Sequence, residues 1–562
     1  MEFKYPPWIP YVILSGVVVF TISMSFVVTW LFKSFRHKAK LPLFVSALGV
    51  SAILFSVSVI PVDIFMISQT EDPSTHGQAI RIVYYSSYLT LFVFAFTLIP
   101  FAYFYYEEGS DEYSSIRWRI INAFKFTVLS LVCGIILVAI VLGLAIGFPN
   151  QPSDAVEWLK ELSRDKTIGD RIVSGLVSVI AIVGLPAWWL YTGYGLAALP
   201  VSLIKGKKKL RLELGSIAEE MVFVSGKISS IKGKYALTGT KMNKADQKEY
   251  DQLKEKLKLL RNRDLLLEKF NSSWYAKCYP FLYPFKVIFG LILLLVSLAL
   301  VVSLIITLID RVIHSTCGIK CGFIIDKSYI FNPFDELLTV SSKVFPIDYI
   351  IFGVFLSFIL IVSLVGLANI GLRFFFVKLY KLKYKRTAPQ GLLTTCIFLM
   401  FIVVVFSFTM NSFAPKYTTF GTQTYHVNGE VIGCDFNGVQ AVNETKPVPV
   451  NGTHTLFYGT VLQEAHNETQ RNVTGRPCYM SQLSMLMNGS SFNGYQIYTL
   501  IFYFGNWVFV VVFCLSLLIA SVRKPASFLP DEDEDEDSDD ESLESLTGSE
   551  MSNRRYGTKY EL

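Results

Sequence analysis

Two aspartates occupy the same local pattern inside otherwise apolar stretches of the chain. Asp63 lies in Val59–Phe65 and Asp348 in Val344–Ile350, and each follows a proline by two positions. A carboxylate at membrane depth is costly unless it faces a cavity or a partner, so one hypothesis is that both line a lumenal pocket or gate. The alternative is that each caps backbone donors beside its proline or rests in the headgroup layer. The sequence leaves both open.

Motifs that would carry catalysis are absent from the sequence. There is no G-x-x-x-x-G-K-[ST] loop for ATP, no H-E-x-x-H and no G-x-S-x-G, and no two of the six histidines stand at a ligand spacing inside an apolar run. We therefore expect no catalytic residue, no metal site and no cofactor bound as a catalyst, and we predict that the chain is not an enzyme. The net charge of +6 divides between a basic central loop and an acidic tail, so nucleic acid is not an expected partner.

Long apolar runs must position these aspartates. The chain is 52% hydrophobic and only 17% charged, against about 25% charged residues in soluble domains, and a run of about 20 apolar residues crosses a hydrocarbon core of roughly 30 Å. The sequence predicts an all-α polytopic integral membrane protein with about nine transmembrane helices in the lipid bilayer. The predicted spans are 8–32, 42–68, 83–106, 123–147, 172–204, 286–309, 347–372, 391–410 and 496–522.

The orientation follows from the positions of lysine and arginine, which collect on the cytosolic side of short loops. Four basic residues follow the first span between Lys33 and Lys40, and only Lys4 precedes it, which predicts a lumenal N-terminus. The predicted domains are then membrane spans 1–5 (1–204), a cytosolic basic helical hairpin (205–285), spans 6–8 (286–410), a lumenal glycosylated loop (411–495), span 9 (496–522) and an acidic, disordered cytosolic tail (523–562).

The loop 411–495 tests this orientation independently, because N-x-S/T sequons are glycosylated only outside the cytosol. A further sequon at Asn271 lies in the predicted cytosolic loop, where we expect it to be unmodified. The predicted glycosylation sites are Asn443, Asn451, Asn467, Asn472 and Asn488.

The cysteines divide between compartments in the same way. Cys434 and Cys478 are alone in the predicted lumenal loop, where an oxidising environment favours a disulfide between them. Cys317 and Cys321 form a C-x3-C pair after span 6, for which a disulfide is an option and a metal site has too few histidine partners.

The cytosolic segment has the patterning of soluble helices, with apolar residues at steps of three and four. Gly233–Lys241 reads as the turn between the two helices. The resulting hairpin is expected either to dock a partner or to lie against the membrane domain. The seam positions are Ile217, Met221, Val224, Ile228 and Ile231, then Leu253, Leu257, Leu260 and Leu267.

The C-terminal segment carries an acidic run from Asp531 to Glu541, of a kind that is normally disordered. Ser538 and Ser542 stand among or beside these carboxylates as candidates for an acidophilic kinase or a sorting signal. A purely solvating tail is the alternative.

Several blocks of sequence together resemble the LMBR1 domain-containing family, in the branch of probable lysosomal cobalamin transporters. They run from the second span to the ninth and leave the glycosylated loop and the tail divergent. The blocks are Ile60–Phe65, Ile99–Glu108, Ala198–Gly206, Asn332-Pro333 with Val344–Tyr349, Asn369–Gly371 and Tyr503–Trp507.

The resemblance implies a nine-span protein of the lysosomal membrane, with the plasma membrane as a second location, that is required for cobalamin to leave the lysosome for the cytosol. Cobalamin would then be the transported ligand, and an ABC transporter of subfamily D the partner. On that implication the chain is either the transporter or its accessory subunit or chaperone. The same superfamily includes cell-surface endocytic receptors of the lipocalin-receptor type, which is the alternative function. No cobalamin-contacting residue carries over.

Overall fold

The computed structural model of the chain is described here for the residues whose placement is defined. They are 9–32, 40–69, 73–109, 115–147, 177, 180–206, 210–238, 242–272, 274–315, 318–321, 323, 329–374, 377–380, 382, 387–427, 430–434, 473–474, 478–486 and 496–523.

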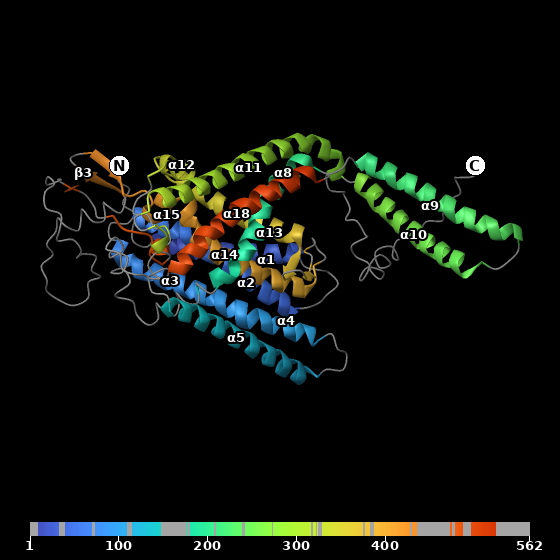
Figure 1. Cartoon of the computed structure of the whole chain (residues 1–562), viewed down its shortest axis with the longest axis horizontal. Coiled ribbons are helices and arrows are strands. Elements are labelled where there is room, and N and C mark those ends of the chain that lie inside the picture. The colour runs from blue at the N-terminus through green and yellow to red at the C-terminus, as the bar shows by residue number, and fades with distance from the viewer. Residues whose placement is uncertain are drawn as a thin grey trace. The chain divides into compact units, whose positions relative to one another are not determined.

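Helices dominate the described ranges (Figure 1). The long helices are α1 (Ile9–Phe32), α2 (Lys40–Gln69), α3 (Pro73–Val93), α5 (Ile116–Gly147), α8 (Gly193–Lys205), α9 (Leu210–Thr238), α10 (Lys244–Ser272), α11 (Trp274–Ile313), α13 (Ile347–Ile370), α14 (Pro389–Phe413) and α18 (Gln496–Val522). The short helices are α4 (Ile99–Glu107), η4 (Gly318–Cys321), α12 (Pro333–Ser341), α15 (Pro415–Phe420) and α17 (Gln482–Leu486), with π-helical turns η1 (Phe94–Leu98) and η3 (Trp188–Thr192).

Nine helices within the described ranges are long and apolar enough to cross a membrane, which confirms the predicted nine-span helical architecture. Each observed span overlaps its predicted counterpart. The spans are Val12–Phe32, Lys40–Ser68, Gly77–Glu107, Ile116–Ile140, Ile180–Lys205, Phe281–Ile313, Ile347–Ile370, Pro389–Phe413 and Leu500–Val522.

The fifth span contains the irregularity that its prolines and glycines suggest. Two residues after Pro186 the helix widens into the π-helical turn η3, and it then continues as α8 through Pro200. Proline lacks the backbone donor that a helix needs at that point, and a local π turn can satisfy the backbone groups that a proline frees in a membrane helix. The span is therefore continuous from 180 to 205.

The centre of the membrane domain is α14, the most buried of the nine spans. It contacts α2, α4, α13 and η3, and Figure 1 shows it among these helices. Trp188 from η3 stacks on Phe406 of α14 and on Phe509 of α18, with ring centroids 5.6 and 5.2 Å apart. All three rings are buried, so large aromatic side chains fill this part of the interior.

A close helix crossing joins η3–α8 to α13. A Cβ added at Gly195 would lie 2.0 Å from the Val362 carbonyl oxygen, and one added at Gly366 would lie 1.9 Å from the Tyr191 carbonyl oxygen. Two glycines facing opposite backbones let the helices approach this closely, as small residues do in membrane proteins generally. Between them the Thr192 and Ser363 hydroxyls are 2.8 Å apart, which ties the crossing together.

Two small antiparallel sheets lie outside the spans. The first joins β1 (Leu372–Phe374) to β2 (Val377–Tyr380) between α13 and α14. The second has the order β4-β3-β5, with β3 (Thr424–Val427) paired to β4 (Glu430–Gly433) and β5 (Val473–Thr474). Each strand is two to four residues long, and none lies within a span.

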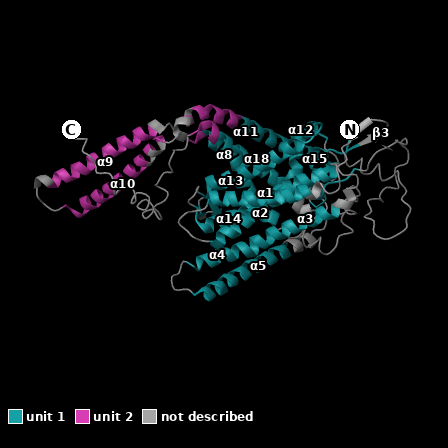
Figure 2. Cartoon of the chain, turned by 180° about the vertical axis from the view of Figure 1, so that it is seen from behind, with its two compact units in different colours: residues 1–201, 292–521 teal, residues 202–291, 522–562 magenta. Residues whose placement is uncertain are grey.

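The chain divides into two compact units, coloured in Figure 2: residues 1–201 with 292–521, and residues 202–291 with 522–562. In the second unit α9 and α10 pack along the predicted apolar seam, with Ile217, Val224, Leu260 and Leu267 buried. The predicted turn at Gly233–Lys241 is wrong at its start, because α9 continues to Thr238. A single glycine costs a helix only about 1 kcal/mol, so Gly233 does not end α9.

Candidate functional site

Asp63 accepts hydrogen bonds from the first residues of the short helix α17. It lies two residues beyond Pro61 within α2, fully buried, and both of its oxygens accept backbone hydrogen bonds. The donors are Gln482 N at 3.2 Å and Leu483 N at 2.8 Å. The first backbone N–H groups of a helix have no partner within the helix, so the carboxylate supplies one from 420 positions away in the sequence.

A second carboxylate, Asp335, does the same for α15. Its oxygens accept from Lys416 N at 3.0 Å and Tyr417 N at 2.9 Å, at the start of α15. Burial raises the pKa of Asp335 to about 6, although these two hydrogen bonds and the nearby Lys416 lower it. Asp335 is not among the predicted site residues because it lies outside the apolar spans.

A sequence signal for Asp335 did exist in the stretch Asn332–Asp335. An asparagine, a proline and then an acidic residue is typical of a helix start. The Asn332 side chain caps α12 by accepting from Phe334 N and Asp335 N, and its amide donates to Thr307 and to the Phe413 carbonyl. This cap fixes α12 between α11 and α14, and so it fixes the Asp335 carboxylate.

Asp348 joins the same site through a tyrosine. The Tyr417 hydroxyl donates to Asp348 Oδ2 at 2.9 Å, while the backbone N–H of Tyr417 donates to Asp335. Tyr417 is fully buried, and burial together with the neighbouring Asp348 charge raises the pKa of its hydroxyl well above the usual value. One tyrosine thus connects the two carboxylates.

The two short helices are hydrogen-bonded to each other, so the three carboxylates belong to one network. The Ser481 hydroxyl donates to the Thr418 carbonyl at 2.7 Å, and Ser481 N donates to the Thr419 carbonyl at 2.8 Å. The Ser484 hydroxyl lies 3.2 Å from that of Thr419. We call this network of Asp63, Asp335, Asp348, Tyr417 and Ser481 the carboxylate junction.

A disulfide closes the loop that leaves the junction. The structure joins Cys434 and Cys478, whose Cα atoms are 5.8 Å apart. Beside it the Gln423 side chain accepts from Tyr479 N at 2.9 Å and donates to the Tyr479 carbonyl at 2.7 Å. The five predicted glycosylation sites, Asn443, Asn451, Asn467, Asn472 and Asn488, and the cysteine at 317 all lie outside the described residues.

Both predicted site aspartates are buried and hydrogen-bonded within the protein. Asp63 is 0% exposed and Asp348 1% exposed, and both carboxylates have hydrogen-bond donors against them. The donors named above are groups of the chain itself: those of Asp63 are backbone groups of α17, and that of Asp348 is a tyrosine side chain of α15. The hypothesis of a lumenal pocket or gate stays a prediction, and in this conformation the pocket would have to open by moving α15 or α17. Within the described ranges no cluster of three histidine, cysteine or acidic side chains is placed to hold a metal ion.

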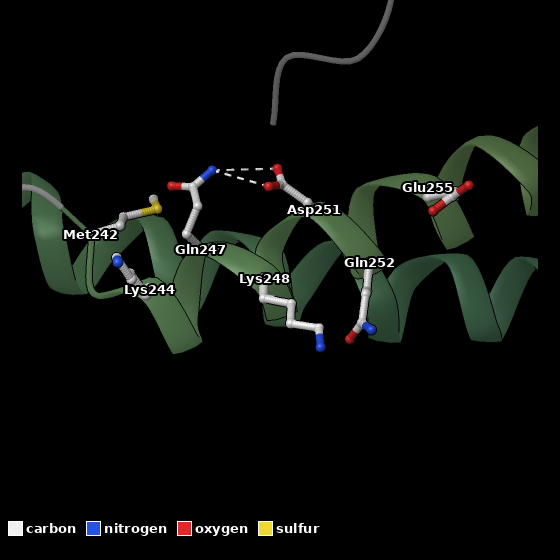
Figure 3. A pocket seen from close by; sticks show the side chains of 7 residues that line it. All are labelled: Met242, Lys244, Gln247, Lys248, Asp251, Gln252 and Glu255. Atoms are coloured by element: carbon white, nitrogen blue, oxygen red, sulfur yellow. Dashed lines mark hydrogen bonds between the residues drawn. The ribbon is translucent and has the colours of Figure 1, made fainter.

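A shallow hollow lies on the hairpin surface along α10, as Figure 3 shows. Most of its side chains carry a positive charge, a negative charge or an amide group. Within it, Gln247 donates to Asp251 at 3.3 Å. Such a mixed, open surface has no convergent set of groups for one ligand. The residues that line it are Met242, Lys244, Gln247, Lys248, Asp251, Gln252 and Glu255.

Comparison with known proteins gives consistent matches. The model of the LMBR1-like membrane proteins matches residues 11–264. The lysosomal cobalamin transport escort protein LMBD1 of Mus musculus is 29% identical over 505 residues, covering 87% of this chain and 89% of that protein. The protein of that name from Gallus gallus is 28% identical, covering 94% and 96%, and that from Homo sapiens is 28% identical, covering 87% and 88%. No solved structure matches the chain.

Proposed function

On the premise that the chain belongs to the LMBR1-like membrane protein family, we propose that it takes part in the export of cobalamin from the lysosome to the cytosol. The observation that carries this proposal is the extent of the likeness: 28–29% identity spread over 87% or more of the chain, to proteins named for escorting cobalamin transport. Each relative reported above carries that name, so the endocytic-receptor alternative gains no support.

We further propose that the chain acts as an escort, or accessory subunit, and that cobalamin passes through a partner. Large buried rings stack across α14, α18 and η3, and the glycines of η3–α8 and α13 bring backbones into contact. An interior filled in this way supports a scaffold more than a path for a large ligand. The sequence has no ATP loop, so an ABC transporter of subfamily D is the proposed source of energy.

The hairpin of α9 and α10 is the proposed docking arm for that transporter. Its seam is buried between the two helices, yet Val222 and Phe223 of α9 are 71% and 63% exposed. Apolar side chains this exposed on a hairpin in water favour a contact with another protein. The proposal places the hairpin and the C-terminal tail in the cytosol and the carboxylate junction in the lysosomal lumen.

Cobalamin efflux from liposomes tests the escort proposal. Liposomes with an acidic interior are loaded with labelled cobalamin and contain either the purified chain alone, or the chain with an ABC transporter of subfamily D and external ATP. We expect efflux only with the transporter and ATP, and faster efflux than with the transporter alone. Efflux from the chain alone would make it the carrier and would contradict the escort role.

A hairpin variant tests the docking arm in cells that lack their own copy of this protein. Val222→Ser with Phe223→Ser leaves the seam intact, and we expect it to reduce lysosomal cobalamin release at unchanged protein abundance. The matched control is Leu259→Ser with Leu265→Ser, which removes exposed leucines of α10. Equal release by wild type and the α9 variant would exclude this face as the docking surface.

Glycan mapping tests the orientation. Removing Asn443, Asn451, Asn467, Asn472 or Asn488 by single Asn→Gln changes is expected to lower the apparent mass of the chain wherever that site is used. Asn271→Gln is expected to leave it unchanged. A glycan at Asn271 would contradict the cytosolic placement of the hairpin.

A further inference from the structure

The ends of three membrane helices meet within residues 202–291 and 522–562. The Lys205 ammonium, at the end of α8, donates to the Arg523 carbonyl at 2.6 Å, just beyond the end of α18. The Tyr283 hydroxyl, in the first part of α11, donates to the Ile204 carbonyl at 3.4 Å. Segments from the middle and the end of the sequence therefore converge on one place.

Two tyrosine side chains of α11, Tyr279 and Tyr283, lie next to Gly206, the residue that follows Lys205. Gly206 has φ +65°, and a Cβ there would lie 2.7 Å from the Tyr283 ring and 3.4 Å from the Tyr279 hydroxyl. The backbone conformation therefore favours glycine, and a larger residue there would displace the Tyr283 ring. The Lys286 ammonium lies 4.9 Å from the centroid of the Tyr279 ring, on the same part of α11.

The charge at this place has one sign. Lys205 begins the run Lys-Gly-Lys-Lys-Lys-Leu-Arg, Lys286 lies in the first part of α11, and Arg523 follows the end of α18. In the sequence, the ranges 202–212, 273–309 and 506–530, which contain these residues, hold no aspartate or glutamate. Orientation of the spans requires basic residues on the cytosolic side but does not require them to gather with tyrosines from three helices.

We propose that this basic junction, formed by Lys205, Lys286 and Arg523 over Tyr279 and Tyr283, binds the phosphate-bearing headgroup of an anionic membrane lipid. The junction lies at the ends of membrane spans, where headgroups are present, and a basic cluster beside a span attracts anionic lipid. Arginine can bind a phosphate through two parallel N–H groups. Tyrosine rings favour the same interfacial layer.

Binding of short-chain lipids to the purified full chain in neutral detergent tests the proposal. The readouts are native mass spectrometry and the midpoint of thermal unfolding. The probes are dioctanoyl phosphatidylinositol phosphate, dioctanoyl phosphatidylcholine and the soluble inositol phosphate headgroup. We expect the anionic lipid to bind and to raise the midpoint, and the effect to weaken at high salt.

The test variant is Lys205→Gln with Lys286→Gln and Arg523→Gln. Each basic residue near a headgroup contributes about a fivefold change in affinity, so we expect the apparent affinity to fall by about 100-fold. The matched control is Lys248→Gln with Lys254→Gln and Lys258→Gln, which removes the same charge from exposed sites on α10. We expect this control to bind like wild type.

Three results would overturn the proposal. They are equal affinity of wild type and the test variant, an equal loss in the α10 control, and equal binding of the free headgroup and the lipid, which would assign the site to a soluble phosphate compound. A chain that ends at Pro530 and so lacks the acidic run is expected to bind at least as tightly as wild type. Loss of binding in that chain would assign the effect to the tail. None of these readouts involves cobalamin, so their failure is separate from failure of the escort function.

Discussion

The carboxylate junction and the basic junction differ in how far their charged groups are buried and in what surrounds them. In the carboxylate junction, Asp63, Asp335 and Asp348 are almost fully buried, and the donors against them are backbone N–H groups and a tyrosine hydroxyl. In the basic junction Arg523 is exposed, and Lys205 and Lys286 are partly exposed, with no acidic residue in the segments that carry them. The buried charges are enclosed by donors of their own chain, whereas the basic charges lie where solvent or a ligand can reach them.

This difference predicts that substitutions in the two regions change different properties. A buried carboxylate that satisfies two backbone donors is costly to remove because the donors then lose their partner. An exposed charge is cheap to remove, since water replaces its interactions. Stability should therefore respond to the first region, and binding to the second.

The largest expected effect follows from Asp335→Ala. It leaves the buried N–H group of Tyr417 and the part-buried N–H group of Lys416 without their acceptor. A buried donor that loses its partner costs about 1–3 kcal/mol, so we expect a loss of at least that size. Thermal unfolding of the purified chain measures the loss. The control is Asp251→Ala on exposed α10, for which we expect a change within about 0.5 kcal/mol. Equal effects of the two changes would remove the distinction between the regions.

The second prediction concerns pH. Burial raises the pKa of Asp335 from 3.8 to about 6, so the folded chain holds this proton more tightly than the unfolded chain does. The stabilisation is complete below about pH 4 and is lost as the pH rises through about 6. For a shift of about two units it amounts to about 3 kcal/mol at most. The thermal midpoint of wild type should fall between pH 4 and 7.

Asp335→Asn isolates that contribution, because its amide does not titrate. Its thermal midpoint should depend less on pH over the same interval than that of wild type. If the two profiles are parallel, the pH dependence originates elsewhere in the chain. The acidic lysosomal lumen of the proposed function would lie in the stabilising part of this range.

A smaller effect is expected from Asp63→Asn. The amide keeps one acceptor oxygen, so one of the two N–H groups at the start of α17 loses its partner, at about 1–3 kcal/mol. Asp348→Asn should be milder, because its amide oxygen can still accept from the Tyr417 hydroxyl. We expect Asp63→Asn to lower protein abundance and leave cobalamin release per molecule unchanged. Reduced release per molecule at normal abundance would favour the pocket or gate hypothesis for Asp63 and Asp348.

The smallest effect is expected on the hairpin surface. The Lys256 ammonium lies 2.8 Å from Glu220 Oε1, and both side chains are about half exposed. Exposed pairs of this kind contribute about 0.2–1 kcal/mol, so Glu220→Ala should change the stability by less than about 1 kcal/mol. A loss comparable to that of Asp335→Ala would show that the hairpin depends on its surface charges.

Local patterns along the sequence determined the helical elements. Runs of apolar residues of about span length predicted nine membrane helices, and apolar residues three and four apart predicted the seam that buries Val224 and Leu260. Both patterns can be recognised locally because they depend on the surroundings of each helical turn, lipid or water, and not on distant parts of the chain. The repeated proline and aspartate motif also directed attention to Asp63 and Asp348.

Only the tertiary structure decided what these aspartates contact. The partner of Asp63 lies 420 positions away at Leu483, and that of Asp348 is 69 positions away at Tyr417. Asp335 entered the same network although its sequence signal indicated only a helix start. The gathering of Lys205, Lys286 and Arg523 depended likewise on where three helices end. A side chain's hydrogen-bond partner is set by the packing of distant helices, and no local pattern encodes that packing.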